Sequence, residues 1–252
     1  MRKTLSIITV CYNSEKQISR SIDSVVPQLN SNVEYVFIDG ASNDATRDII
    51  REKCGEIEYK LVSEKDNGIY DAMNKGLDKS TGEYVYFLNT DDCLLPGAVA
   101  AITKSIEEYP MADCILGNVE VVDFDSDGTE RLIKLWRGDS DLSNLEKGMI
   151  CSHQGMICKR STVLEAGGFY TKLKIAADWD LILRLYKKGM QFQYVDMNIA
   201  RFSRGGVSVR KEHEWERHIV RKRNRCFHCI DHELIIAIKT KIYSLLHNKQ
   251  KR

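Results

Sequence analysis

The sequence predicts an α/β protein with a doubly wound, mostly parallel sheet and helices on both faces. Three observations support this fold class. Four strand-like runs alternate with helical patterns over residues 1–110, the runs are nearly continuous in apolar residues, and acidic residues follow several of them. Alternating strands and helices build parallel sheets, whose strands are buried on both faces. Such sheets bind ligands beyond the carboxyl ends of their strands.

The first 110 residues contain four βα units, each with its own pattern. In the first helical segment, Ile18, Ile22, Val25, Val26 and Leu29 recur at the spacing of an amphipathic helix. The expected strands are 5–13, 33–40, 57–64 and 83–89, and the expected helices are 14–29, 41–54, 68–80 and 96–109.

After residue 110 the pattern becomes β-rich and mixed. Two runs, 112–124 and 130–136, are expected to pair through the turn sequence DSDG. Further expected elements are a short strand ending at 159–160, a helix over 161–169 broken by Gly167 and Gly168, an amphipathic helix over 178–189, and short strands at 190–196 and 198–203. From about residue 209 the chain is expected to be helical and basic.

Charge is distributed unevenly along the 252 residues. Residues 201–252 hold 14 Lys and Arg against 5 Asp and Glu, a balance of +9, which leaves residues 1–200 with a balance of −8. The length allows one sizeable core or one domain with an appendage. An acidic body with a basic tail indicates two surfaces with different partners.

The eight cysteines are irregularly spaced, and several lie inside apolar strand-like runs. A chain of this size does not need disulfides, so we expect reduced thiols and a cytoplasmic location. The basic start and apolar run of residues 1–13 are also similar to a signal peptide. That run is short and no small-x-small cleavage site follows, so a first strand is the preferred interpretation. No apolar run approaches the roughly 20 residues of a membrane span.

Acidic residues collect where the ligand of a parallel sheet is expected. Asp39 ends the second strand, Asp66 follows the third, and Asp91 and Asp92 follow the fourth. Two adjacent carboxylates repel each other, and a divalent cation, Mn²⁺ or Mg²⁺, bound together with substrate phosphates would relieve that repulsion. The alternative is a solvated turn in which Asp92 caps the next helix.

Six motifs in order carry a resemblance to a known family. LSIITVCYN, FIDGASNDAT, EKDNGIYDAMNKG, YFLNTDD, SHQG and DWDLILRL resemble segments of the inverting family 2 nucleotide-sugar glycosyltransferases of the GT-A fold, over roughly residues 4–208. The segment NGIYDAMNKG is similar to the subgroup that builds bacterial O-antigen (lipopolysaccharide), capsule and exopolysaccharide chains. The resemblance implies a GT-A domain over 1–208, with a nucleotide-binding half (1–110) and an acceptor-binding half (111–208), and a basic helical C-terminal extension over 209–252.

The resemblance implies a nucleotide site at the ends of the first three strands. Tyr12 and Asn13 would lie beside the nucleobase, and Asp39 would accept a hydrogen bond from it. Asp66 and Asn67 would lie near the base or ribose. Each also has a structural explanation, because Tyr12 suits core packing, and the sequences around Asp39 and Asn67 are rich in turn formers.

Further residues would contact the diphosphate and the sugars. Lys75 would lie near the diphosphate, with a solvated side chain as the alternative. His153 and Gln154 would bind near the acceptor and the donor sugar, although a lone histidine is more often structural.

The metal motif of the family, usually written DxD, is spelled Asn89-Thr90-Asp91-Asp92 here, so an asparagine replaces its first acid. The resemblance implies that Asp92 binds the metal and that Asp91 lies near the nucleotide sugar. The reverse assignment stays open.

The catalytic base implied by the resemblance is Asp178. An inverting transfer needs one carboxylate that takes the proton of the attacking hydroxyl. The preceding position, usually acidic in the family, is Ala177, and Asp180 is therefore kept as an alternative base. A purely structural alternative is that Asp178 caps the helix that follows.

The function expected from the sequence is the inverting transfer of a sugar from a nucleoside-diphosphate donor, with UDP as the usual nucleotide of the family, to a saccharide or lipid-linked saccharide acceptor. The alternatives are a nucleotidyltransferase of similar fold and a non-catalytic sugar-nucleotide-binding or scaffold protein. The basic amphipathic pattern after residue 234 favours contact with the inner face of the membrane or with a partner protein. Nucleic-acid binding is not expected, because no recognisable nucleic-acid-binding fold is present.

Overall fold

A computed structural model describes residues 3–125, 128–204 and 212–226 of the chain. The strands are β1 (Leu5–Cys11), β2 (Val33–Asp39), β3 (Tyr59–Ser63), β4 (Tyr84–Phe87), β5 (Cys93–Leu94), β6 (Cys114–Phe124), β7 (Glu130–Trp136), β8 (Met156–Lys159) and β9 (Phe192–Ser203). The helices are α1 (Ile18–Val25), α2 (Thr46–Cys54), α3 (Ile69–Lys79), α4 (Ala98–Glu108), α5 (Arg160–Glu165), α6 (Ala177–Lys187) and α7 (Glu212–Arg223), with short 3₁₀ turns η1 (Val26–Gln28), η2 (Leu142–Glu146) and η3 (His153–Gly155).

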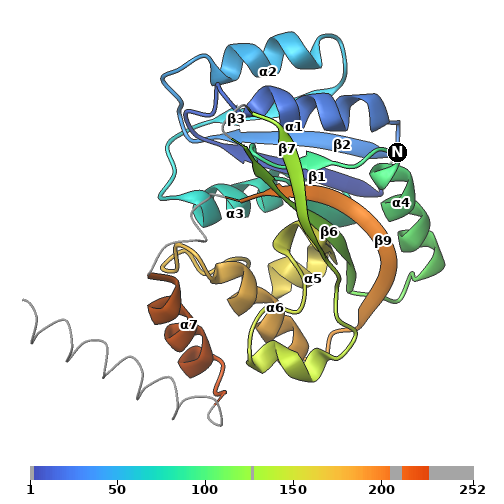
Figure 1. The fold of residues 1–252 in the computed structure, drawn as a ribbon, viewed down its shortest axis with the longest axis vertical. Helices are drawn as coiled ribbons and strands as arrows, with labels where there is room; N and C mark the ends of the chain where they lie inside the picture. Colours follow the sequence, from blue (N-terminus) through green and yellow to red (C-terminus); the bar gives the residue numbers. More distant parts are fainter. Residues whose placement is uncertain (1–2, 126–127, 205–211, 227–252) are drawn as a thin grey trace, which may run out of the picture.

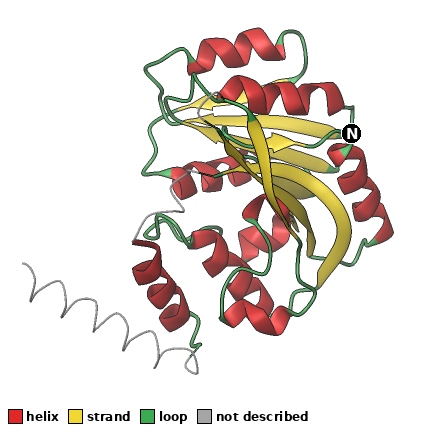
Figure 2. Ribbon diagram, viewed as in Figure 1, coloured by secondary structure: helices red, strands yellow, loops and turns green. Residues whose placement is uncertain are grey.

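These strands form one curled sheet in the order β3-β2-β1-β4-β8-β6-β9-β5, with β7 paired to β6 (Figure 2). The four strands of the first 110 residues that were expected from the alternation are parallel: β1 pairs with both β2 and β4, and β2 pairs with β3. Their carboxyl ends therefore meet at one edge, as the sequence predicted.

The strands are apolar on both sides because helices cover both faces of the sheet (Figure 1). Alternate residues of β1 divide between two cores: Leu5 and Ile7 pack with α1, α2 and α4, whereas Ile8 and Val10 pack with α3 and α6. A strand with two buried faces has no polar alternation, which explains the continuous apolar run in the sequence.

The second half of the sheet is mixed, as expected. Strand β6 pairs antiparallel with β7 and with β8, which confirms the predicted hairpin. The two short strands expected over 190–203 are one strand, β9, which pairs parallel with β6 and antiparallel with β5. Register shifts along β6 and β9 let the long strand bend without a break. Helix α5 ends before Gly167 and Gly168, which have φ of 83° and 65°.

Other sequence expectations have clear outcomes in the described residues. Residues 5–11 form a strand, which agrees with the preferred interpretation of the N-terminal run. All seven described cysteines are buried free thiols. None of the described helices has the length and apolar character that a bilayer crossing requires. The amphipathic pattern after residue 234 lies outside the described residues.

Candidate active site

A cavity of about 930 Å³ opens at the carboxyl ends of β1 and β4, between the two halves of the chain. Five segments line it. They are the end of β1 with residues 10–14, the start of α3 with most of 66–73, the acidic turn after β4 with 89–91, most of the segment 148–154, and the start of α6 with most of 174–179. Of the residues expected at the site, Tyr12, Asn13, Asp66, Asp91, His153, Gln154 and Asp178 line this cavity, whereas Asp39, Asn67, Lys75 and Asp92 do not.

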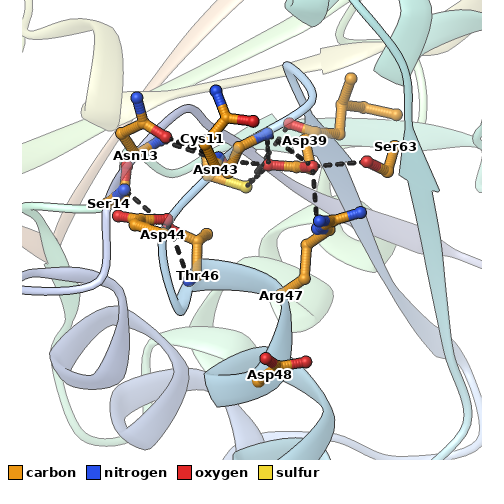
Figure 3. A network of polar contacts seen from close by, with 12 residues as sticks. Cys11, Asn13, Ser14, Asp39, Asn43, Asp44, Thr46, Arg47, Asp48 and Ser63 are labelled. Carbon is orange, nitrogen blue, oxygen red and sulfur yellow. Dashed lines mark hydrogen bonds and ion pairs between the residues drawn. The ribbon is translucent and has the colours of Figure 1, made fainter.

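Asp39 is fully buried at the end of β2, at the centre of a network of polar contacts (Figure 3). Its carboxylate accepts hydrogen bonds from the Ser42 backbone N–H at 3.2 Å and from the Ser63 hydroxyl at 2.6 Å, and Arg47 lies 3.9 Å away. Ser42 Oγ in turn accepts from the Asn13 backbone N–H at 2.8 Å. The Asp39 network therefore sets the position of the residues that line the cavity at the end of β1.

Tyr12 and Asn13 project from that network into the cavity. Tyr12 is 60 % exposed, which is unusual for a tyrosine directly after a buried strand and excludes core packing as its role. Asn13 has φ of 48°, a left-handed conformation that asparagine adopts more easily than most residues. Its side-chain oxygen accepts a hydrogen bond from the Asn43 backbone N–H at 2.9 Å, which leaves its amide nitrogen for another acceptor.

Asp66 lies next to Gly40 on the same side of the cavity. Its carboxylate accepts a hydrogen bond from the Gly68 backbone N–H at 2.8 Å, and a Cβ at Gly40 would collide with its other oxygen. Asn67 and Lys75 point elsewhere. Asn67 donates to Asp71, and Lys75 pairs with Glu64 at 3.1 Å and donates to the Lys65 carbonyl.

Asp91 and Asp92 have different environments. Asp91 lines the cavity, whereas Asp92 is 0 % exposed behind it. The Asp92 carboxylate accepts hydrogen bonds from Gln154 Nε2 at 2.7 Å, Asn89 Nδ2 at 3.2 Å and the Ser203 backbone N–H at 3.1 Å. Burial and the nearby Asp91 charge raise the pKa of Asp92 well above its ordinary value, and burial also raises the pKa of Asp91.

Asn89 and His153 bring unpaired polar atoms to the cavity. The Asn89 side-chain oxygen and both ring nitrogens of His153 are buried, with no hydrogen-bond partner among the residues that the structure describes. Unpaired buried polar atoms cost free energy, so they indicate a missing partner. Burial lowers the pKa of His153, which keeps its ring neutral near pH 7. The ring packs between Phe87 and Phe169.

The oxygens near the acidic turn suit a hard divalent cation. Asn89 and Asp91 both line the cavity, and the buried amide oxygen of Asn89 has no hydrogen-bond partner among the described residues. Amide and carboxylate oxygens are ligands that favour Mg²⁺ or Mn²⁺. Within the described residues, no three His, Cys, Asp or Glu side chains gather closely enough to enclose a metal on their own.

The two candidate bases on α6 are clearly separated. Asp178 lines the cavity at the second position of the helix, with its Oδ1 3.5 Å from the Tyr70 hydroxyl. Asp180 is 0 % exposed and pairs with Arg184 at 2.8 Å and with Arg223 at 3.2 Å. Asp180 therefore holds α6 to α7 and does not line the cavity.

Several cavity residues were not expected from the sequence. Trp136, Trp179 and Phe202 add aromatic side chains to the lining of the cavity, and Arg217 reaches it from α7. The Arg217 guanidinium lies 5.5 Å from the centre of the Trp179 ring, and its buried Nε has no hydrogen-bond partner within the described part of the chain. Trp179 adjoins Asp178 in sequence and could have been suspected, but nothing near Arg217 in the sequence links it to the cavity.

Comparison with known proteins defines the class. Residues 6–165 match the profile of "Glycosyl transferase family 2", so the chain belongs to this family, and the resemblance seen in the six motifs is confirmed. It is similar to a "PGL/p-HBAD biosynthesis glycosyltransferase" of Mycobacterium tuberculosis, with 29 % identity over 209 residues, 81 % of this chain and 78 % of the relative. "Glycosyltransferase GlyA" of Streptococcus pneumoniae is 31 % identical over 116 residues, 45 % of this chain and 16 % of that protein.

Solved structures support the same conclusion at the level of the fold. The chain superposes on S. aureus TarS 1–349 in complex with UDP-GlcNAc with a TM-score of 0.70 and 18 % identity, covering 88 % of this chain and 65 % of that one. For a mannosyltransferase of Pyrobaculum calidifontis in complex with GDP-Man and Mn²⁺, the TM-score is 0.60 at 21 % identity, covering 88 % and 61 %. This chain thus spans less than two thirds of each of those structures, and the likeness confirms the expected GT-A fold. With the family match, the protein is a glycosyltransferase.

Proposed function

We propose that the protein transfers a sugar, with inversion, from a nucleoside-diphosphate donor of the UDP type to a saccharide or lipid-linked saccharide acceptor in the synthesis of a bacterial cell-surface polysaccharide. The observation that carries this proposal is the composition of the cavity. It joins Tyr12 and Asp66 from the first half of the chain to His153 and Asp178 from the second.

The nucleotide end of the cavity has the groups that a base and ribose require. Tyr12 offers an exposed ring for stacking, and Asn13 and Asp66 offer polar atoms on either side of it. Asp39 supports this end indirectly, through the contact of Ser42 with Asn13. The Asp39 carboxylate is enclosed in this structure, so it would have to become accessible before it could contact the base directly. Residues 1–110 are therefore proposed as the nucleotide-binding half and 111–208 as the acceptor-binding half.

The cation is proposed to bind at the acidic turn, where it would offset the negative charge of the leaving diphosphate. Asp91 and Asn89 line the cavity, and the Asn89 amide oxygen has no hydrogen-bond partner among the described residues, which favours these two residues as the pair that binds the ion. Asp92, the ligand expected from the sequence, would first have to exchange its contact with Gln154 for the ion.

Asp178 is proposed to take the proton of the acceptor hydroxyl. As that oxygen bonds to the anomeric carbon, the bond from the same carbon to the diphosphate oxygen breaks on the opposite face, and the proton passes to the carboxylate. The neutral ring of His153 and the aromatic wall formed by Trp136 and Trp179 would orient the two sugars. Aromatic rings suit the apolar faces of pyranoses because they bury area without restricting hydroxyl groups.

The broader setting follows the relatives and the charge distribution. The M. tuberculosis relative is named for PGL/p-HBAD biosynthesis, which supports a bacterial glycolipid or glycan acceptor. The excess of 14 basic over 5 acidic residues after residue 200 supports attraction to an anionic membrane surface from the cytoplasmic side.

A binding screen tests the proposal directly. Thermal unfolding of the full chain is measured with UDP, GDP or dTDP, each in the presence of Mn²⁺ or of EDTA. A ligand at about 100 times its Kd adds about 2.7 kcal/mol of stability, so one nucleotide should raise Tm by several degrees, and only with Mn²⁺. If no nucleoside diphosphate raises Tm in the presence of metal, the proposal fails.

A further inference from the structure

Helix α7 reaches the start of α6 through one buried acid, Glu216, which is 8 % exposed. In sequence this residue lies in the basic segment after residue 208, and nothing in that segment suggests a link to the cavity. Two arginines near it on the same helix, Arg217 and Arg221, lie over the ring of Trp179. Their guanidinium carbons are 5.5 Å and 5.3 Å from the centre of that ring. The described part of α7 thus packs directly beside Asp178.

The Glu216 carboxylate accepts three hydrogen bonds from consecutive backbone N–H groups. One oxygen accepts from Lys174 at 2.7 Å, and the other accepts from Ile175 at 2.8 Å and from Ala176 at 2.9 Å. The N-cap of α6 is Ala176, which has no side chain able to cap the helix. A residue distant in sequence therefore places a negative charge at the N-terminus of α6, where the helix dipole favours it, and accepts from the N–H groups of the N-cap residue and of the two residues before it.

The same short segment is fixed from its other side by Tyr70. The Tyr70 hydroxyl donates to the Ile175 carbonyl at 2.7 Å and lies 3.5 Å from Asp178 Oδ1. Ile175 is thus held by its carbonyl from α3 and by its N–H from α7. Because Asp178 follows Ala176 by only two residues, these contacts determine where its carboxylate lies in the cavity.

Glu216 is committed to these backbone groups. Among the described residues, no basic side chain lies within ion-pair distance of it, even though Arg217 is its neighbour in sequence. A buried carboxylate bound only to backbone N–H groups fixes the path of the chain more firmly than a surface ion pair, which is worth little.

We propose that Glu216 is a positioning residue for the transfer: its carboxylate fixes the turn before α6 and thereby places the Asp178 carboxylate against the acceptor. This inference rests on the proposed role of Asp178 as the base. It makes the described part of α7 a component of the catalytic unit rather than an appendage.

The test compares Glu216→Ala with a matched control, Arg223→Ala, in the full chain. Arg223 lies on the same helix, pairs with Asp180 at 3.2 Å and covers the Tyr170 ring, so its loss loosens α7 without touching the 174–176 segment. The activity measured is Mn²⁺-dependent release of UDP from an equimolar mixture of UDP-glucose, UDP-galactose, UDP-GlcNAc and UDP-GalNAc. In this hydrolysis, water takes the place of the acceptor and loses its proton to the Asp178 carboxylate.

A misplaced catalytic group costs about 10- to 100-fold in rate, so Glu216→Ala should lower kcat by that factor and leave the Kd of UDP nearly unchanged. Hydrogen exchange at the amides of 174–176 should accelerate in Glu216→Ala and not in Arg223→Ala. Glu216→Gln keeps one acceptor oxygen and should recover part of kcat. If Glu216→Ala does not fold, the Glu216→Gln variant carries the same comparison.

Two results would overturn the inference, and they are distinguishable. In the first, Asp178→Asn abolishes UDP release, but Glu216→Ala and Arg223→Ala show the same loss of activity and the same loss of Tm. Glu216 would then have only a structural role. If Asp178→Asn retains the activity, the proposed base is wrong, and the positioning role fails with it.

Discussion

Gln154 Nε2 donates a hydrogen bond to Asp92 Oδ2 across 2.7 Å and so ties the acceptor-side segment to the acidic turn after β4. The bond lies in a region from which solvent is excluded, and Asp92 has two further donors in Asn89 and the Ser203 backbone. Even so, burial and the charge of Asp91 raise the pKa of the Asp92 carboxyl well above its ordinary value. The free energy that the acidic turn contributes to folding should therefore depend on pH.

The first prediction concerns this pH dependence. A carboxyl whose pKa is raised in the folded state binds more protons in the folded protein than in the unfolded chain. Its contribution to the free energy of unfolding is therefore fully present below the unfolded pKa, about 3.9, and is lost as pH rises through the folded pKa. Asp91→Asn removes the like charge. We expect the metal-free variant to be more stable than the wild type at about pH 8, and the difference to shrink towards about pH 5.

The measurement is the free energy of unfolding in urea at several pH values, with EDTA or with Mn²⁺. A cation near the pair favours the ionised carboxylates, so Mn²⁺ should stabilise the wild type increasingly as pH rises and should stabilise Asp91→Asn much less. Equal responses of both proteins to Mn²⁺ would contradict a cation site at this turn.

The second prediction concerns the close approach of Gly40 to Asp66. A Cβ at position 40 would collide with Asp66 Oδ2, so Gly40→Ala should displace that carboxylate from its contact with the Gly68 N–H. We expect the affinity for UDP with Mn²⁺ to fall about tenfold, which corresponds to about 1.4 kcal/mol. Titration calorimetry measures this affinity.

A double-variant cycle provides the control for Gly40→Ala. If the substitution acts through Asp66, adding Gly40→Ala to Asp66→Ala should cause little further loss, because residues in contact are not additive. Full additivity of the two losses would show that the methyl group acts elsewhere, for example on Tyr12, whose ring lies 3.3 Å from the same Cβ position.

The sequence predicted the first half of the fold well because its signals are local. Strand β1 has seven buried residues in a row, and α1 follows with a clear apolar face, so each element could be inferred without its neighbours. Parallel topology then brings the acids after β2, β3 and β4 to one edge. Which of those carboxylates reach the cavity was not predictable, because Asp39 and Asp92 are enclosed by residues distant in sequence, such as Ser63 and Gln154.

The second half was harder to predict because its decisive contacts are long-range. The single strand β9 follows from pairing with both β6 and β5, which no local pattern reveals. The contact between Glu216 and Ile175 joins positions 41 residues apart. Charge counting marked the segment after residue 200 as a separate basic region, whereas Glu216 within it is buried and bonded to the chain just before α6.

The third prediction separates the two acids of α6. Asp178→Asn should lower transfer by about 10²- to 10⁴-fold, the usual contribution of a general base, and leave the Kd of UDP unchanged. Asp180→Asn should instead destabilise the fold by about 3–5 kcal/mol, because it leaves the Arg184 and Arg223 guanidinium groups without their buried partner.

Steady-state kinetics and urea unfolding on both variants decide between the two roles. Activity is compared below the onset of unfolding of Asp180→Asn, so that only folded protein is assayed. A folded Asp180→Asn protein that has lost transfer while Asp178→Asn keeps it would reverse the assignment.

The last prediction concerns His153, whose ring packs against Phe87 and Phe169 and whose two buried nitrogens have no hydrogen-bond partner in residues 3–125, 128–204 and 212–226. Burial lowers the pKa of this histidine, so the neutral ring loses hydrogen bonds without gaining a charge interaction. His153→Phe removes both unpaired atoms from an aromatic pocket, and the free energy of unfolding should stay equal or rise by about 1 kcal/mol.

If the His153 ring binds a sugar hydroxyl, the same variant should bind its donor sugar about 3- to 10-fold more weakly, which is the value of one hydrogen bond. Phe87→Leu, which alters the same wall without removing a polar atom, is the control and should lower stability more than affinity. A stable His153→Phe protein with unchanged affinity and activity would show that the ring only fills space, and a destabilised one would show that its nitrogens have partners in the protein after all.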